Sequence, residues 1–260
     1  MKQPIIIANW KMNISSKETD FLLADILKEL KKNKSIKNFD LVFCPDLISL
    51  ISAQNIIKKN KIGGLNIALG AQNCFWEERG SYTGETSPLF LKQIGCQYVL
   101  VGHSERREYL GETSEMINKK IKIALNNDLT PIVCVGETFT ERQSGARDYK
   151  IMEQVGQALD GVKLKVHQKL ILAYEPVWVS GSGQTILADE AEYVNRVIKQ
   201  KMIDLYPLPI VRNNINFVYG GNINHNNIKK FLEQDTIDGI LVGAASLNPT
   251  EFIRLCRIIS

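Results

Sequence analysis

Leu170-Ile171-Leu172-Ala173-Tyr174 is an unbroken apolar run that stops abruptly at Glu175 and Pro176. A strand with one face in water alternates apolar and polar residues, whereas a parallel strand covered on both faces is apolar throughout. Residues 170–174 are therefore predicted to form a buried parallel strand. Seven further runs of this kind are spread along the chain: Ile5 to Trp10, Phe39 to Cys44, Asn66 to Ala71, Tyr98 to Gly102, Pro131 to Gly136, Asn216 to Gly220 and Gly239 to Val242.

Longer stretches with helical periodicity separate these runs. In the first, Ser15 and Glu18 have the spacing of a capping box, which starts a helix. An apolar stripe at helical spacing follows, formed by Leu23, Ile26, Leu27 and Leu30. This alternation, without a linker or low-complexity tract, predicts an α/β fold with a closed (β/α)8 barrel of parallel strands, helices outside, as a single domain over residues 1–260. An open doubly wound sheet is the alternative.

The charge balance argues against a nucleic-acid-binding surface. The chain has 32 Lys and Arg against 28 Asp and Glu, a net charge of +4, which is too small and too dispersed for that role. The densest basic runs, residues 31–34 and 58–61, each close an amphipathic stretch and are predicted to be solvated helix ends. We therefore expect no nucleic-acid partner.

The cysteines and the N-terminal residues indicate the cellular compartment of the protein. The cysteines are odd in number and lack CxxC spacing, which indicates free thiols rather than a disulfide or zinc framework; they are Cys44, Cys74, Cys96, Cys134 and Cys256. The apolar run from Ile5 is interrupted by Asn9 and Lys11, so it is too short for a signal peptide, and no run of about 18 apolar residues suggests a membrane span. We expect a cytoplasmic protein without metal or membrane contact.

Polar residues stand directly after several of the predicted strands. In a barrel, the groups that carry function follow the carboxyl ends of the strands. Asn9 and Lys11 follow the first strand, His103 the fourth and Glu175 the sixth. Lys11 could be a solvated lysine and His103 a structural imidazole, but a partly desolvated carboxylate at Glu175, before the rigid Pro176, is a candidate general base.

Small residues follow the last two strands instead. Gly220-Gly221 and Gly243-Ala244 would let backbone N–H groups approach an anion closely, and barrels commonly hold a phosphate at this place. One Gly pair alone is more often a tight turn, whereas two such pairs at adjacent strand ends favour a phosphate site. The segment from Val177 to Thr185, with its central glycines, is predicted to be a hinged lid, with a merely flexible loop as the alternative.

These strand-end motifs, in this order and with this spacing, resemble the triosephosphate isomerases along the whole chain. The motifs are Asn9-Trp10-Lys11-Met12-Asn13, Gly102-His103-Ser104-Glu105-Arg106-Arg107, Cys134-Val135-Gly136-Glu137-Thr138, Ala173-Tyr174-Glu175-Pro176-Val177-Trp178 and Tyr219-Gly220-Gly221. The resemblance implies a TIM barrel that interconverts D-glyceraldehyde 3-phosphate and dihydroxyacetone phosphate through an enediolate. It further implies a role in glycolysis and gluconeogenesis and no cofactor.

The resemblance also assigns roles to residues. It makes Glu175 the base that moves a proton between C1 and C2, and His103 the neutral electrophile at the carbonyl oxygen. Lys11 would supply positive charge and Asn9 a hydrogen-bond donor. The phosphate would be held by the backbone of Gly181, Asn222, Gly243 and Ala244, with Glu105 and Cys134 as supporting neighbours.

The family is usually dimeric, and residues 72–85 match the loop that enters the neighbouring subunit. The resemblance includes Gln72 and Asn73 at the start of this loop and Thr83 near its end. Thr83 would reach Asn9 of the partner subunit and Lys11 of the partner subunit. Glu85 and Arg106 would form the ion pair that holds the base of the loop.

The chain departs from the family pattern in three places. Asn222 stands where the family usually has Ser, and Ala244 where it usually has a second Gly. The lid reads Val179-Ser180-Gly181-Ser182-Gly183-Gln184-Thr185, whereas the family usually has Ala, Ile, Thr and Lys at the first, second, fourth and sixth of these positions. All three departures touch the phosphate site or the lid.

Two other functions remain open from the sequence. The same base and electrophile would serve an isomerase of a longer, four-carbon ketose phosphate. A catalytically silent barrel could bind phosphate without turnover, although the presence of Asn9, Lys11, His103 and Glu175 argues against that alternative.

Overall fold

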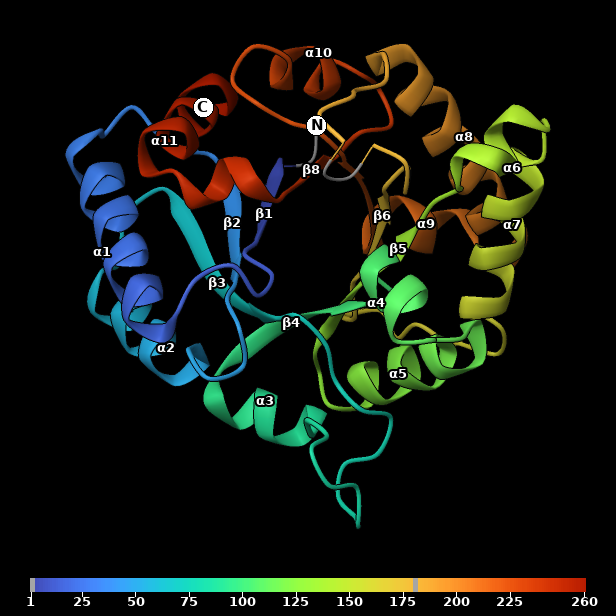
Figure 1. The fold of residues 1–260 in the computed structure, drawn as a ribbon, viewed down its shortest axis with the longest axis horizontal. Coiled ribbons are helices and arrows are strands. Elements are labelled where there is room, and N and C mark those ends of the chain that lie inside the picture. Colours follow the sequence, from blue (N-terminus) through green and yellow to red (C-terminus); the bar gives the residue numbers. More distant parts are fainter. Residues whose placement is uncertain (1–2, 180–181) are drawn as a thin grey trace.

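The computed structural model describes residues 3–179 and 182–260. Over these residues eight parallel strands form a closed barrel in chain order (Figure 1). Pairing of the first strand with the last closes the barrel and excludes the open doubly wound sheet. The strands are β1 (Ile5–Asn9), β2 (Phe39–Cys44), β3 (Leu65–Ala71), β4 (Cys96–Val101), β5 (Thr130–Val135), β6 (Leu170–Tyr174), β7 (Ile215–Gly220) and β8 (Gly239–Val242).

The helices surround the barrel (Figure 1). A 3₁₀ turn, η1 (Ala244–Leu247), follows β8 directly. The helices are α1 (Ser16–Lys32), α2 (Leu50–Lys59), α3 (Pro88–Ile94), α4 (Ser104–Tyr109), α5 (Ser114–Asn126), α6 (Phe139–Gln143), α7 (Arg147–Ala158), α8 (Ala188–Leu205), α9 (Leu208–Asn214), α10 (Ile228–Leu232) and α11 (Pro249–Ile259). Of the described residues, no helix combines the length and the apolar character needed to cross a membrane.

The predicted capping box starts α1 as expected. Ser15 accepts a hydrogen bond from the backbone N–H of Glu18, whose carboxylate accepts one from the backbone N–H of Ser15 at 2.8 Å. The predicted apolar stripe is buried, and the basic runs begin in the last turns of α1 and α2, where cations face the negative end of the helix dipole. All of these predictions are confirmed.

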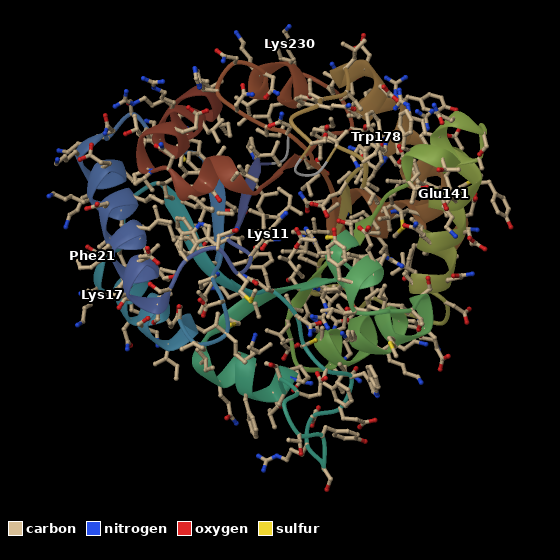
Figure 2. The ribbon with its side chains drawn as sticks, viewed as in Figure 1. Lys11, Lys17, Phe21, Glu141, Trp178 and Lys230 are labelled. Carbon is tan, nitrogen blue, oxygen red and sulfur yellow. The ribbon has the colours of Figure 1, made fainter. Side chains whose placement is uncertain are left out.

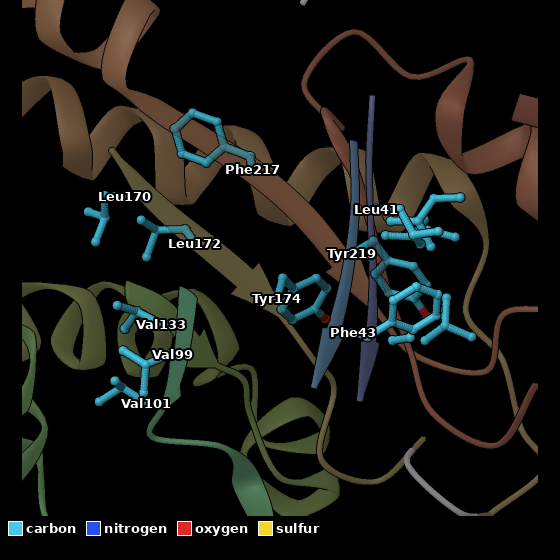
Figure 3. Close-up of a cluster of buried hydrophobic side chains, with 14 of the residues drawn as sticks. Leu41, Phe43, Val99, Val101, Val133, Leu170, Leu172, Tyr174, Phe217 and Tyr219 are labelled. Carbon is cyan, nitrogen blue, oxygen red and sulfur yellow. The ribbon is translucent and has the colours of Figure 1, made fainter. Parts of the chain in front are cut away.

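The core has two layers because successive residues of a strand point to opposite faces. In β1, Ile5 and Ile7 belong to the inner cluster that fills the barrel, whereas Ile6 and Ala8 belong to the outer cluster between barrel and helices. Figure 3 shows part of the outer cluster, including Tyr174 and Tyr219. Since both faces are covered, the strands read as unbroken apolar runs. The five cysteines are free and buried.

Candidate active site

A cavity of about 630 Å³ opens at the carboxyl ends of the strands. It brings together residues that the sequence analysis singled out from five separate strand ends. These are Asn9, Lys11, His103, Glu105, Glu175, Asn222, Gly243 and Ala244. Gly181 lies outside the described residues, so its predicted place in the phosphate site has no structural counterpart here. The cavity therefore holds both the predicted catalytic groups and most of the predicted phosphate ligands.

Lys11 is held in the cavity by a strained backbone turn after β1. Its φ of 53° lies in the left-handed region, which costs a residue with a side chain about 1 kcal/mol or more. The backbone N–H of Lys11 donates to Asn9 Oδ1 at 3.1 Å, and Gln72 Nε2 donates to the carbonyl of Lys11 at 2.8 Å. Lys11 Nζ lies 2.7 Å from Glu105 Oε1. Figure 2 shows Lys11 near the centre of the barrel, while Lys17 and Phe21 lie at its periphery.

The tautomer of His103 follows from the start of helix α4. His103 is the N-cap of α4, and its Nδ1 accepts a hydrogen bond from the backbone N–H of Glu105 at 3.3 Å. Nδ1 also lies 3.5 Å from Glu105 Oε2, but that separation exceeds a normal hydrogen bond, so the backbone contact decides the assignment. An accepting Nδ1 leaves the proton on Nε2. Nε2 faces Glu175 Oε2 at 3.5 Å.

Glu175 is largely desolvated at the end of β6. Only 13% of its side chain is exposed, and Oε2 is fully buried without a hydrogen-bond partner among the described residues. The Cys134 thiol lies against the carboxylate; burial, and secondly the charge of Glu175, raise the pKa of this thiol well above its usual value. The thiol therefore stays protonated.

Two glycines make room for Glu175. A Cβ at Gly220 would lie 2.6 Å from Glu175 Cγ, and a Cβ at Gly136 would lie 1.8 Å from the carbonyl oxygen of Glu175. From the sequence, Gly220 is predicted to be part of an anion site, because small residues after the last strands of a barrel are typical of phosphate binding. The structure gives this glycine another reason: the Glu175 side chain packs directly on its backbone.

The departures at Asn222 and Ala244 have clear structural consequences. The Asn222 side-chain amide donates to the carbonyl of Gly183 at 3.1 Å, so it contacts the segment predicted to be a lid near its C-terminal end. Ala244 starts the 3₁₀ turn η1, and its φ is not positive. A Cβ is therefore tolerated at this position, and Ala244 lines the cavity.

Comparison with known proteins decides the family. The profile of one family, triosephosphate isomerase, matches residues 4–259. The chain belongs to the triosephosphate isomerase family. It is 43% identical to the triosephosphate isomerase of Dictyoglomus turgidum, over 99% of this chain and 100% of the relative. The triosephosphate isomerase of Dictyoglomus thermophilum is 44% identical over the same shares, and that of a Thermoanaerobacter species is 41% identical over 98% and 99%.

Glu137 was not singled out from the sequence, but it contacts the segment that follows Glu175. It is fully buried, and burial raises its pKa. Its Oε1 accepts hydrogen bonds from Trp178 Nε1 at 3.1 Å and from the Tyr174 hydroxyl at 3.3 Å. The backbone N–H of Val177 donates to its carbonyl at 3.0 Å. Glu137 thus fixes Val177 and Trp178, the first residues of the predicted lid, and its place in the motif that begins at Cys134 was the available signal.

Arg106, at the base of the loop of residues 72–85, has its ion-pair partner within the single chain. Within the single chain Arg106 pairs with Glu112, and no ion pair between Arg106 and Glu85 is found among the described residues; a pair between these two side chains across the proposed dimer stays a prediction. The backbone N–H of Glu112 donates to the carbonyl of Arg106 at 3.1 Å, and this turn brings the two side chains together, whereas Glu85 is exposed. Buried Lys120 lies 3.2 Å from Glu112 and donates to Asn73 Oδ1 at 2.8 Å.

Proposed function

We propose that this chain interconverts D-glyceraldehyde 3-phosphate and dihydroxyacetone phosphate, with Glu175 as the base and His103 as the electrophile. The observation that carries the proposal is the facing pair itself. A desolvated carboxylate and an N–H donor of a neutral imidazole stand 3.5 Å apart in one cavity. Membership of the triosephosphate isomerase family supports the same reaction.

The proposed chemistry moves one proton by way of an enediolate. Glu175 takes a proton from C1 of dihydroxyacetone phosphate, and the C–H electron pair forms the C1–C2 double bond. The carbonyl π electrons move to oxygen, where His103 Nε2–H donates and the Lys11 ammonium offsets the charge. In the second half, the proton of the C1 hydroxyl passes by way of His103 to the oxygen on C2, so the C1 oxygen becomes the new carbonyl. The double-bond electrons then take up the proton of the Glu175 carboxyl at C2. Asn9 supplies a further donor beside Lys11.

The phosphate group would lie at the ends of β7 and β8. The proposed ligands are the backbone N–H groups of Asn222, Gly243 and Ala244, with Gly181 of the lid as a fourth. Asn222 and Gly243 face the same cavity as Lys11, which supports this arrangement. Backbone N–H groups at the start of a turn are suited to a phosphate because they bring partial positive charge without a bulky side chain.

Further proposals concern the setting of the reaction. We propose that residues 1–260 form one catalytic domain, that it works in the cytoplasm in glycolysis and gluconeogenesis, and that it needs no cofactor. Its partners would be the triose phosphate and a second copy of the chain, not nucleic acid or membrane. The absence of a membrane-spanning helix among the described residues is compatible with this.

Substrate length separates this proposal from its alternatives. Glyceraldehyde 3-phosphate should be turned over about 100-fold better, in kcat/KM, than the four-carbon erythrose 4-phosphate, since the one added carbon must find space in the cavity. A coupled dehydrogenase assay reads the triose product, and NMR reads the four-carbon product. Equal or reversed values would contradict the proposal. Phosphate binding without turnover of either sugar would support the silent barrel.

We propose a homodimer formed by the loop of residues 72–85. A second cavity, of about 480 Å³, lies beside Gln72 and Asn73 and is lined partly by apolar side chains. Two of these, Met12 and Tyr109, are 93% and 72% exposed in the single chain. Exposed apolar side chains next to a cavity are typical of surfaces that bind another protein. Thr83 from the partner's loop would enter this cavity beside Asn9 and Lys11.

Dilution is expected to lower the specific activity as the dimer dissociates. Each subunit carries its own catalytic groups, but the strained turn at Lys11 would lose the support of the partner's loop. Specific activity and sedimentation should be measured over the same range of protein concentration, with ovalbumin added in parallel assays as a control for surface loss. Activity that stays constant through the dimer-to-monomer transition would contradict the prediction.

A further inference from the structure

The loop after β7, residues 221–227, is joined to helix α11 by one side-chain pair. His225 Nδ1 lies 2.8 Å and 2.7 Å from the two carboxylate oxygens of Glu251. The backbone N–H of His225 donates to Glu251 Oε1 at 2.9 Å. Both oxygens of the carboxylate are therefore engaged by a single residue, 26 positions away in the chain.

Glu251 makes this contact in place of a more local one. It is the third residue of α11, the position from which an acidic side chain usually turns back to the N-cap. Glu18 does so at the start of α1, where it bonds Ser15. In α11 the N-cap Asn248 accepts from the backbone N–H of Glu251 at 3.0 Å, but the carboxylate reaches across to His225. The carboxylate thus serves the contact between loop and helix.

The pair connects the two segments that would hold the phosphate. Asn222 belongs to the loop after β7, and its carbonyl accepts from Asn227 Nδ2 at 2.8 Å. Asn227 Oδ1 in turn accepts from the backbone N–H of Asn224 at 2.9 Å, so the loop is braced internally. Helix α11 begins directly after η1, which carries Ala244. Fixing the loop on α11 therefore fixes the two halves of the phosphate site relative to each other.

The charge of Glu251 matters because this residue also lines the catalytic cavity. Burial alone would raise its pKa, but hydrogen bonds from the backbone and side chain of His225 hold the pKa of Glu251 below its usual value. Glu251 is therefore ionised at neutral pH. A carboxylate that was free to turn into the cavity would repel a phosphate dianion.

We propose that His225 is a positioning residue for the phosphate group of the substrate. It holds the Glu251 carboxylate in the contact with the loop, so that the carboxylate does not turn toward the phosphate. The inference rests on the proposed function, in which Asn222, Gly243 and Ala244 bind a dianionic phosphate monoester.

The first test is His225→Ala in the full-length chain, with inorganic phosphate as the probe. We expect KM for glyceraldehyde 3-phosphate and Ki for phosphate both to rise about fivefold or more, because the freed carboxylate opposes the anion. Since Glu175 and His103 are untouched, kcat should change less than about twofold. Adding Glu251→Gln to this variant should restore most of the phosphate affinity, since the amide is neutral.

The variants separate electrostatic positioning from a purely structural role. If the double variant binds phosphate as weakly as His225→Ala, or if kcat falls while KM is unchanged, the inference is overturned. Glu251→Gln alone gives an independent measurement should His225→Ala fold poorly: its phosphate Ki should equal or fall below that of the unaltered protein, and a higher Ki also overturns the inference. If the unaltered protein is not inhibited competitively by phosphate, the proposed function itself fails.

Discussion

Replacing Glu175 by Gln is expected to lower kcat by about 10³-fold while the protein still binds phosphate. The amide has nearly the shape of the carboxylate, so the packing on Gly220 is kept, but it cannot take a proton from carbon. That loss corresponds to about 4 kcal/mol of transition-state stabilisation. Steady-state kinetics in both directions, together with the Ki of inorganic phosphate, should be measured on the purified variant.

The control for this experiment is Glu233→Gln, which makes the same chemical change outside the catalytic cavity. Glu233 is exposed and pairs loosely with Lys229 at 3.8 Å, so its replacement should leave kcat within about twofold. A Glu175→Gln protein that keeps more than a tenth of the original kcat would exclude Glu175 as the base. Loss of phosphate inhibition along with turnover would instead indicate that the cavity had collapsed.

His103→Ala is expected to lower kcat by about 10² to 10³, with a smaller change in the Ki for phosphate. The substitution removes the Nε2–H donor, so the negative charge that develops on the substrate oxygen loses its partner. His103→Gln should recover part of the loss, because its amide can donate to the same oxygen and still accept from the backbone N–H of Glu105. A His103→Ala variant with kcat within threefold of the original would rule out the electrophile role.

Most of the fold could be predicted from the sequence because burial on both faces leaves a simple signature. Every predicted strand overlaps an observed one. Trp10, Gly102 and Gly136 were predicted as strand residues but lie just past the strands. Gly102 shows the reason: its φ of +73° lies in the left-handed region, which ends an extended strand although the residue remains apolar.

Most of the candidate site could also be predicted from the sequence, since the carboxyl ends of parallel strands in a barrel all meet at one end. That topology alone predicts that Lys11, His103 and Glu175 share a cavity. The tautomer of His103, the ion pair of Lys11 and the backbone strain at Lys11 could not be predicted from the sequence. The assignment of Nδ1 as an acceptor in His103 depends on where the first turn of α4 directs one N–H group, and no sequence pattern gives that direction.

What the sequence determined by itself was the order of elements, the barrel, the family and the strand-end residues, because these follow from local periodicity and fixed spacing along the chain. Only the tertiary structure decided that Arg106 pairs with Glu112 within the chain, that Gly220 makes room for Glu175, and that His225 binds Glu251. Such contacts join residues from different loops, and an ångström in the path of either loop changes which charged groups meet.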